Sequence, residues 1–550
     1  MIIYPSGYSN KNAVYLPSIQ STFLVQLKKQ FSDLRDGEVP AHIPNMEALN
    51  FWSGKGLFYW PNMLYSPGSK KFGKTWKSQL ATHQKTHSPM ADRDRSTSFC
   101  MVDSGGFQIV TDHKFNFVDY NNITKLNEHR LGLLRWQEAY GDMALTFEAP
   151  TLTALIHGKN HPRLKTDQDC LDFTIESMTF AQQHQEQKVK WIAPIQGVDF
   201  KTQKKWYNAV KQFKPYGFAF ACSQSAGKKA PFRNAYTLLR MLRYMIDDGA
   251  FTYCRHVHLL GMTGPMLALT ATVIKFCLHY AGSDEETSSV VENDIEVTFD
   301  SASYSVAMSV GNMYPGSEHD KNVISRLKTL HVPQDEIDKK SGKLIKNYSD
   351  EWADKDQQIP GDMRSPVLKG LKYSDLVGWT KTPYKKTGLQ NRIWDPVANS
   401  IMINQNVWQE IEQLKDSFKW YAKVRDFNDI ISRTYKPHNL GEVESNYYED
   451  ALNWKFDEKL FDENQRKVGF LGELITDLGK EMRDTGEIPH WLAESAVINL
   501  VQNGVLPETA LPHGTSTFED AYRLDKLVRQ MLSSKQKISK ADQTFLENVF

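Results

Sequence analysis

The sequence predicts an α/β protein built on a closed (β/α)8 barrel. Short apolar runs alternate with helical stretches along most of the chain. Strands that are apolar throughout, rather than at every second residue, suit a parallel sheet that is buried on both faces. Eight such runs favour a closed barrel over the alternative, a doubly wound open sheet. The absence of a Gly-x-Gly-x-x-Gly after the first run counts mildly against that alternative.

Eight apolar runs are the expected strands, and the stretches between them have helical spacing. The expected strands are Gly56–Met63, Ser98–Val102, Met143–Phe147, Trp191–Ile195, Gly217–Cys222, His256–Gly261, Ile295–Phe299 and Ser400–Asn404. The expected helices include Asp167–Gln187, Thr202–Phe213, Pro231–Asp247 and Gly264–Tyr280, the last opening with Gly-Pro as a helix start does.

Composition indicates a packed globular protein that is soluble and not exported. The chain has 550 residues, 40% of them hydrophobic, and its net charge is only +1. No basic start followed by an apolar core opens the sequence, and no apolar stretch reaches the length of a membrane span. Its five cysteines are scattered, and none follows Cys277. An odd number of scattered cysteines fits buried thiols in a reducing compartment.

The stretch Ser98–Gln108, SFCMVDSGGFQ, organises the expected barrel. An apolar run ends at Asp103 and enters a tight Ser-Gly-Gly turn, so Asp103 stands at the carboxyl end of a strand. Paired glycines let the backbone approach a flat ligand, and Phe107 is able to stack on it. An Asp that merely caps a turn is the plainer reading of an isolated motif.

Polar or small residues follow several of the other runs at the same place. They are Glu148, Gln196, Ser223 with Gln224, and Asp300. The carboxyl ends of barrel strands meet on one face, where the active sites of this fold lie. Two aspartates on that face are able to divide displacement chemistry, one as nucleophile and one as general acid or base. Metal binding and helix capping are alternatives for carboxylates at strand ends.

Six ordered motifs resemble those of the tRNA-guanine transglycosylases and their DNA-modifying relatives. They are VDSGGFQ at 102–108, LTFEAP at 145–150, PIQG at 194–197, GFAFACS at 217–223, HLLGMTGP at 258–265 and TFDSAS at 298–303. The resemblance spans roughly 56–311 and extends weakly to 399–420, which is similar to the family's last strand and helix.

The resemblance implies a pentosyltransferase that exchanges a nucleic-acid base. Asp300 would attack the sugar and expel guanine, and Asp103 would handle the proton of the incoming base. The residues that would contact the base are Ser104, Gly105, Phe107, Glu148, Gln196, Gly197, Cys222, Ser223 and Leu260. The second substrate would be a free 7-deazaguanine such as preQ0, with no cofactor.

The departures from the family point toward DNA. Where the tRNA enzymes carry two arginines after the nucleophile, this chain has Val306 and Ser309. The family's thiolate zinc site has no counterpart, because residues 301–550 contain no cysteine, so no metal is expected. The chain therefore resembles most the DpdA-type enzymes of bacteria and phages, which place 7-deazaguanine in DNA as a defence or anti-restriction mark. A cytoplasmic location in a bacterium or a phage-infected cell follows from that resemblance.

The net charge is near zero, so any binding to nucleic acid must depend on local basic patches. The patch assigned to the DNA backbone consists of Lys381, Lys385, Lys386 and Arg392, close to Tyr384 and Trp394. The patch 201–214 instead has the spacing of the outer face of an amphipathic helix. Lysine on a solvated face is the plainer reading of any one patch.

The expected domains are an N-terminal segment 1–50, a barrel 51–434 and a helical domain 435–550. The barrel would carry an insertion at 312–398 between its seventh and eighth strands. Two functions compete with DNA-guanine exchange: a tRNA-guanine transglycosylase, and a nucleic-acid-binding barrel without catalysis. Removal of the base by water is also conceivable. The sequence does not identify protein partners.

Overall fold

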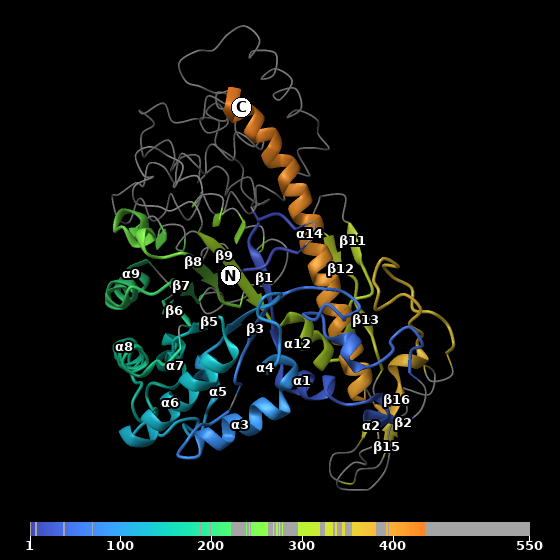
Figure 1. The fold of residues 1–550 in the computed structure, drawn as a ribbon, viewed down its shortest axis with the longest axis horizontal. Helices are drawn as coiled ribbons and strands as arrows, with labels where there is room; N and C mark the ends of the chain where they lie inside the picture. Colours follow the sequence, from blue (N-terminus) through green and yellow to red (C-terminus); the bar gives the residue numbers. More distant parts are fainter. Residues whose placement is uncertain are drawn as a thin grey trace, which may run out of the picture.

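The computed structural model is a closed barrel of eight parallel strands surrounded by helices (Figure 1). Spatial order follows chain order, and the last strand pairs with the first. The strands are β1 (Val14–Ile19), β3 (Asn62–Tyr65), β4 (Phe99–Val102), β5 (Met143–Leu145), β6 (Lys190–Ile195), β7 (Gly217–Phe220), β8 (His256–Leu259) and β9 (Glu296–Ser301). The α/β barrel predicted from the sequence is confirmed.

The description covers most of the chain up to residue 434. It omits 1, 6–7, 11, 37–38, 69, 188, 198–199, 222–237, 239–240, 243, 262–267, 269–270, 273, 276–277, 279–294, 320–324, 334–335, 338–340, 342–343, 347–351, 353–354, 381–391, 394 and 435–550. The expected helical domain 435–550 therefore lies outside the described residues, as do most of the expected helices Pro231–Asp247 and Gly264–Tyr280.

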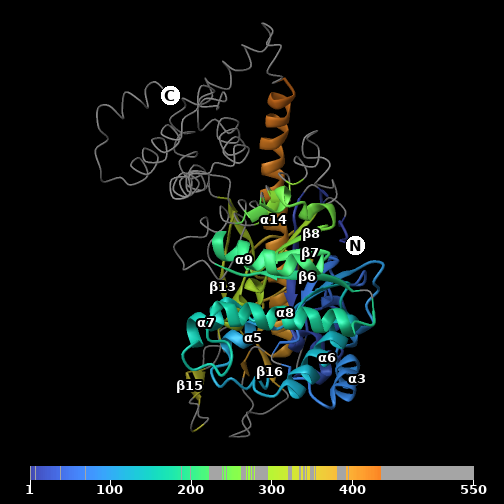
Figure 2. The ribbon, with the colours of Figure 1, turned by 90° about the vertical axis from the view of Figure 1, so that its left-hand side faces the viewer.

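Helices pack around the barrel and shield its strands from water (Figure 2). They are α1 (Ser21–Leu27), α2 (Phe31–Leu34), α3 (Trp76–Thr86), α4 (Ser88–Ala91), α5 (Gly106–Thr111), α6 (Ile123–Tyr140), α7 (Thr151–His157), α8 (Asp167–His184), α9 (Phe200–Val210), α12 (Ser303–Ser309) and α14 (Pro396–Thr434). Short 3-10 turns are η1 (Met46–Leu49), η2 (Lys211–Phe213), η3 (Ala250–Thr252) and η4 (Ser374–Leu376).

Local chemistry explains where these elements begin and how closely they pack. All four residues of β4, and likewise of β7 and β8, are buried, as expected for strands that are covered on both faces. Helix α8 begins with a capping box in which Thr166 and Asp169 satisfy each other's backbone N–H groups. Gly141 lets α6 pack tightly, because a Cβ there would lie 2.5 Å from Val102. Helix α9 buries Trp206 and Tyr207 and exposes Lys201 and Lys205, which confirms the amphipathic reading of 201–214.

The first barrel strand lies inside the segment 1–50, which the sequence analysis set apart from the barrel. Strand β1 pairs with β3 through Ser18 and Leu64, and with β9 through Leu16 and Asp300. The expected boundary at residue 50 is therefore wrong. Pro17 lies within this strand, and a proline in an apolar run argues against a strand because it donates no hydrogen bond to a neighbour.

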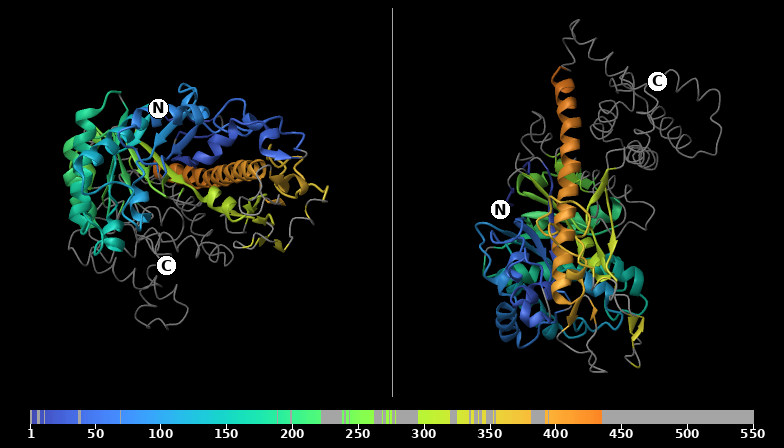
Figure 3. Two further views of the ribbon diagram at one scale, coloured as in Figure 1. Left: turned by 90° about the horizontal axis from the view of Figure 1, so that it is seen from below. Right: turned by 90° about the vertical axis from the view of Figure 1, so that its right-hand side faces the viewer.

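The expected last strand, Ser400–Asn404, is also wrong, because these residues belong to the long helix α14. From Val397 to Ile411 almost every described side chain is buried, including polar ones such as Asn404 and Gln405. The run therefore has no solvent-exposed face of the kind that marks an amphipathic helix. Helix α14 packs against α1, η1 and α12 and continues past the barrel (Figure 3). It follows the barrel as an outer helix and does not close it.

The segment expected as an insertion between two strands therefore lies between α12 and α14. It forms small antiparallel sheets rather than part of the barrel. Their strands are β10 (Asn312–Met313), β11 (Ser317–His319), β12 (Ser325–Leu327), β13 (Leu330–His331), β14 (Glu336–Ile337), β15 (Leu344–Lys346), β16 (Gly378–Thr380) and β17 (Arg392–Ile393). Strand β16 also pairs with β2 (Arg35–Asp36), which fixes this segment to the region that follows β1.

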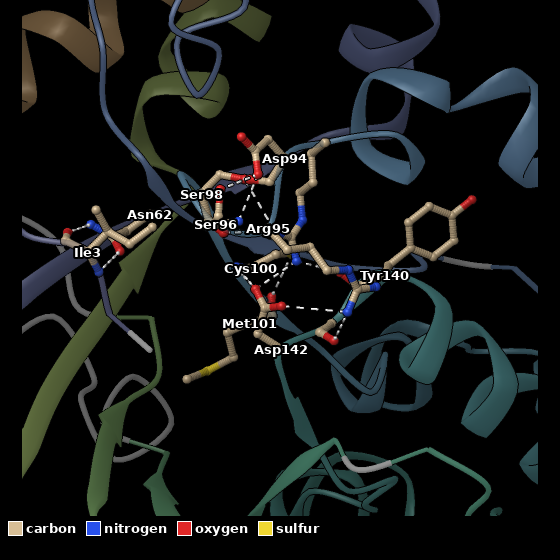
Figure 4. A network of polar contacts seen from close by, with 12 residues as sticks. Ile3, Asn62, Asp94, Arg95, Ser96, Ser98, Cys100, Met101, Tyr140 and Asp142 are labelled. Atoms are coloured by element: carbon tan, nitrogen blue, oxygen red, sulfur yellow. Dashed lines mark hydrogen bonds and ion pairs between the residues drawn. The ribbon is translucent and has the colours of Figure 1, made fainter.

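Polar contacts join neighbouring strands at the amino ends of the barrel (Figure 4). The side chain of Asn62 accepts from the N–H of Ile3 and donates to its carbonyl, at 3.0 and 2.6 Å. Asp142 accepts from the N–H of Cys100 at 2.8 Å and pairs with the buried guanidinium of Arg93 at 2.6 Å. This end of the barrel is thereby stabilised, while the carboxyl ends carry the side chains of interest for chemistry.

Candidate active site

Four predicted site residues stand at the carboxyl ends of four barrel strands. Asp103 follows β4, Glu148 lies three residues past β5, Gln196 follows β6, and Asp300 is the penultimate residue of β9. Asp300 and Asp103 are near enough for the charge of Asp300 to raise the pKa of Asp103. Asp103 in turn raises the pKa of Glu148. The barrel therefore brings these carboxyl groups together, as the sequence predicted.

Asp103 is a partly buried carboxyl group with an elevated proton affinity. Desolvation by burial is the main cause of its raised pKa, and the charge of Asp300 adds to it. Hydrogen bonds oppose this shift: Ser66 donates to Oδ2 at 3.0 Å, and the N–H of Ser104 donates to Oδ1 at 2.7 Å. The result is an oriented acid that releases its proton less readily than an exposed Asp.

Glu148 and Gln196 form a buried polar pair beside Asp103. Gln196 Nε2 donates to Glu148 Oε2 at 2.6 Å, and both side chains are buried. Burial is the main cause that raises the pKa of Glu148 to about 8. Gln196 Oε1 is buried without a hydrogen-bond partner among the described residues. At neutral pH the pair therefore offers a carboxyl proton and an unused acceptor.

The glycines of the motif make room for this pair. A Cβ at Gly106 would lie 2.8 Å from Cγ of Glu148, so only glycine allows the glutamate this position. Gly105 precedes α5 in the left-handed region, with φ at 75°. Ser104 is buried, and its hydroxyl accepts from the N–H of Gly106 at 3.3 Å. The predicted turn therefore has a defined shape rather than being a generic loop.

Asp300 is held on one oxygen only. Its Oδ1 accepts from the N–H of Gly261 at 2.8 Å and lies 3.3 Å from Nε2 of His258. Its Oδ2 accepts no hydrogen bond from any residue that the structure describes. One oxygen is therefore anchored, and the other is available to a bound molecule.

The remaining predicted base contacts differ in how they are placed. Phe107 lies on α5 and is 57% exposed, so its ring is available for stacking. Leu260 follows β8 and is half-buried. Gly197 follows Gln196 with φ at 126°, in the region that favours glycine. Cys222 and Ser223 lie outside the described residues.

The predicted DNA-binding patch is largely outside the description. Lys381, Lys385 and Lys386 are not described, and only the backbone of Arg392 is, in β17. That strand pairs with β16.

Two features near Asp300 were missed by the sequence analysis. One is His258, which alternates with His256 in the strand HVHL, and histidines at every second residue of a buried strand are a usable signal. The other is Glu410 of α14, which accepts from Tyr15 at 2.7 Å and from Ser303 at 2.5 Å. Burial raises the pKa of Glu410 to about 7. Glu410 carried no signal, because its contacts depend on how α14 packs against the barrel.

Together the fold and these side chains define an α/β barrel with a carboxyl-rich site at the carboxyl ends of its strands. No protein-family model matches the chain, and no curated protein matches it either. Within the described residues, no group of three or more His, Cys, Asp or Glu side chains is arranged to hold a metal ion. None of the helices described there has the length and apolar character needed to cross a bilayer.

Proposed function

We propose that this protein is a transglycosylase that exchanges guanine in DNA for a 7-deazaguanine. The proposal rests on two neighbouring carboxyl groups in different environments. Asp300 has one oxygen that accepts no hydrogen bond from the described residues, and Asp103 nearby has a raised pKa. Neighbouring carboxyls whose environments differ in this way are typical of enzymes that assign one to attack and the other to proton transfer. The ordered motifs from VDSGGFQ to TFDSAS support the same reaction.

In the first step, Asp300 Oδ2 forms a bond to C1′ of the target nucleotide while the C1′–N9 bond breaks. Guanine leaves with a proton from Asp103, whose raised pKa suits it to donate. The products are free guanine, an aspartyl ester of the sugar and an ionised Asp103. Because the carboxylate approaches from the face opposite the leaving base, the sugar is inverted once.

In the second step, the incoming 7-deazaguanine gives its N9 proton to Asp103, and N9 attacks C1′. The ester bond breaks and Asp300 returns to its carboxylate form. A second inversion restores the original configuration, as in retaining glycosidases. Both aspartates end the cycle in the state in which they began it, so the reaction needs no further reactant.

Recognition of the base is assigned to Glu148 and Gln196. The Watson–Crick edge of guanine presents an acceptor at O6 and donors at N1 and N2. A protonated Glu148 supplies a donor, and the unused Oε1 of Gln196 supplies an acceptor. A 7-deazaguanine has the same edge, so one pair of side chains would serve both the leaving and the entering base.

DNA is preferred to tRNA as the substrate because of the residues on α12. Val306 and Ser309 occupy the positions of two tRNA-binding arginines in the family, and both are exposed on the helix directly after Asp300. A neutral surface there offers no cation for the phosphates of an anticodon loop. The target base would have to be flipped out of the duplex, at a cost of a few kcal/mol.

Mass spectrometry of nucleosides tests the exchange directly. DNA and tRNA are each incubated with the protein and a panel of 7-deazaguanines, and the digested nucleosides are then analysed. We expect the modified deoxynucleoside in DNA together with released guanine. Modified tRNA alone would favour the tRNA enzyme, abasic sites would favour hydrolysis, and unchanged nucleic acid with retained binding would favour a non-catalytic barrel.

The roles of the two aspartates predict different defects. Asp300→Asn removes the nucleophile, so we expect no exchange and no denaturant-resistant adduct between protein and DNA. Asp103→Asn removes the proton-transfer group, so turnover should stop while an adduct is still trapped. An adduct in Asp300→Asn protein would assign the nucleophile to another residue.

A further inference from the structure

Two buried histidines and a threonine form a line of polar contacts that ends at Asp300. His256 and His258 belong to β8, Thr298 belongs to β9, and none of the three is accessible to solvent. Thr298 Oγ1 lies 2.8 Å from Nε2 of His256 and 2.8 Å from Nδ1 of His258. The other ring nitrogen of His258, Nε2, lies 3.3 Å from Oδ1 of Asp300.

With both rings neutral, the hydrogens of this line fit together in one favourable way. A threonine hydroxyl has a single proton, so Thr298 donates to one histidine and accepts from the other. If Thr298 donated to His256, Nε2 of His258 would present a lone pair to the carboxylate, which is repulsive. The favourable order has His256 donating to Thr298, Thr298 donating to Nδ1 of His258, and Nε2–H of His258 facing Asp300.

The unpaired atoms agree with this order. Nδ1 of His256 is buried without a partner among the described residues. In the favourable order this nitrogen carries a lone pair, whereas the reverse order would bury an N–H with no acceptor. Burial also lowers the pKa of His256 well below its ordinary value, so this ring is neutral and has one N–H to give.

The position of His258 is unusual for a residue that only fills space. Its Nε2 makes no regular hydrogen bond to any described group, although it is completely buried, and the carboxylate of Asp300 is the polar group it faces. Contacts of catalytic groups are often long before the substrate binds and shorten in the complex. In metal sites and catalytic triads, a hydrogen bond to one ring nitrogen of a histidine fixes its tautomer. The other ring nitrogen is then oriented toward its partner.

We propose that His258 is the positioning residue of the nucleophile: the line His256–Thr298–His258 presents Nε2–H to Oδ1 of Asp300 and so turns Oδ2 toward the sugar. This inference rests on the proposed function, in which Oδ2 forms the ester. Gly261 N–H binds the same Oδ1 from the loop after β8, so two donors on one oxygen define the plane of the carboxylate.

The tautomer is measurable without any activity. In protein labelled with 15N at histidine, long-range proton–nitrogen NMR distinguishes Nε2–H from Nδ1–H, and the signal absent from His258→Asn protein is that of His258. We expect the Nε2–H form, and we expect its nitrogen shifts to change in Asp300→Ala protein. An Nδ1–H form, or shifts that do not respond to Asp300→Ala, would overturn the proposal.

The matched pair of substitutions is His258→Gln and His258→Asn. A glutamine amide reaches about as far as Nε2 of histidine, whereas an asparagine amide reaches only about as far as Nδ1. We expect His258→Gln to retain adduct formation within a few-fold of the wild-type rate and His258→Asn to lose at least tenfold. Binding of the free base by calorimetry should be unchanged in both, because Glu148 and Gln196 hold it.

Failure of this inference differs from failure of the proposed function. Wild-type rates of adduct formation in both variants, with both proteins folded by thermal unfolding, would overturn the role of His258 while the transglycosylase remains. If the wild-type protein forms no adduct with any nucleic acid, the proposed function fails. In that case the NMR result alone decides whether His258 orients Asp300.

Discussion

At the scale of single residues, the site depends on carboxyl groups that are kept partly or wholly out of water. Glu148 is the clearest example, because burial raises its pKa to about 8 while its only described side-chain partner is the neutral amide of Gln196. A protonated glutamate can donate a hydrogen bond, which an ionised one cannot. Burial thereby converts an ordinary acid into a neutral group that is able to donate a hydrogen bond.

Glu148 makes stability depend on pH in a defined direction. Between its usual value of 4.5 and about 8, the folded protein keeps a proton that the unfolded chain has released. Stability therefore falls as pH rises through this window, by about 1.4 kcal/mol per pH unit. Glu148→Gln removes this dependence. The free energy of unfolding of the variant, measured in urea, should therefore increase relative to that of the wild type between pH 5 and pH 8.

The comparison of the two proteins isolates Glu148. Asp103 and Glu410 also have raised pKa values and lower stability in the same direction, but both are present in the wild type and in the variant. The contribution of Glu410 therefore cancels in the difference, and that of Asp103 cancels apart from its electrostatic coupling to Glu148. A stability difference that stays constant from pH 5 to pH 8 would show that Glu148 is already ionised at the lower pH.

Most of the site could be predicted at this scale because its residues carry local signals. Asp103 and Asp300 end apolar runs, and the structure places both at the carboxyl ends of strands. His258 was missed although two histidines alternate in its strand HVHL, since a buried histidine in a strand is usually a core residue. The hydrogen bond between Tyr15 and Glu410 joins residues that are far apart in the sequence, so no local pattern could indicate it.

At the scale of elements, helix α14 is anchored at its beginning by Asp395. Its Oδ1 accepts from the N–H groups of Val397 and Ala398 at 2.7 and 3.0 Å, and its Oδ2 pairs with Arg35 at 2.7 Å. Both charged side chains are almost completely buried. One carboxylate thus caps the helix and ties it to the segment after β1.

Asp395→Ala should destabilise the protein by about 3–5 kcal/mol, because it removes the carboxylate that pairs with the buried Arg35 and removes a helix cap. Equilibrium unfolding in urea measures the loss. A suitable control is Asp356→Ala, which breaks the exposed pair with Lys372 and should cost about 1 kcal/mol or less. Equal effects of the two substitutions would mean that burial does not strengthen the Arg35 pair.

The elements that the sequence misplaced are those whose local pattern is ambiguous. Ser400–Asn404 is apolar and short, and periodicity alone cannot distinguish a buried strand from part of a buried helix. Strand β1 was missed because it contains Pro17, and proline is uncommon inside strands. Most of the other strands were found within a few residues, because uninterrupted apolar runs between turn residues have few alternatives. The exception is β3, which begins at Asn62, near the end of the predicted run Gly56–Met63.

At the scale of the whole molecule, a net charge of +1 leaves nucleic-acid binding to local patches. We expect replacement of Lys381, Lys385, Lys386 and Arg392 by Ala to weaken DNA binding and to reduce its salt dependence. Binding of the free base should not change. Titrations at several salt concentrations measure the slope, and an unaltered slope would remove this patch from the interface.

The closure of the barrel between β1 and β9 also bears on the order of events during synthesis. Strand β9, which carries Asp300, closes the barrel by pairing with β1, the barrel strand that is translated earliest. One edge of β1 therefore stays unpaired until almost all of the barrel has been translated. Contacts between such distant parts of a chain form late and slowly. The proposed activity would then arise in a single final event, because no shorter nascent chain has the closed barrel that positions Asp300.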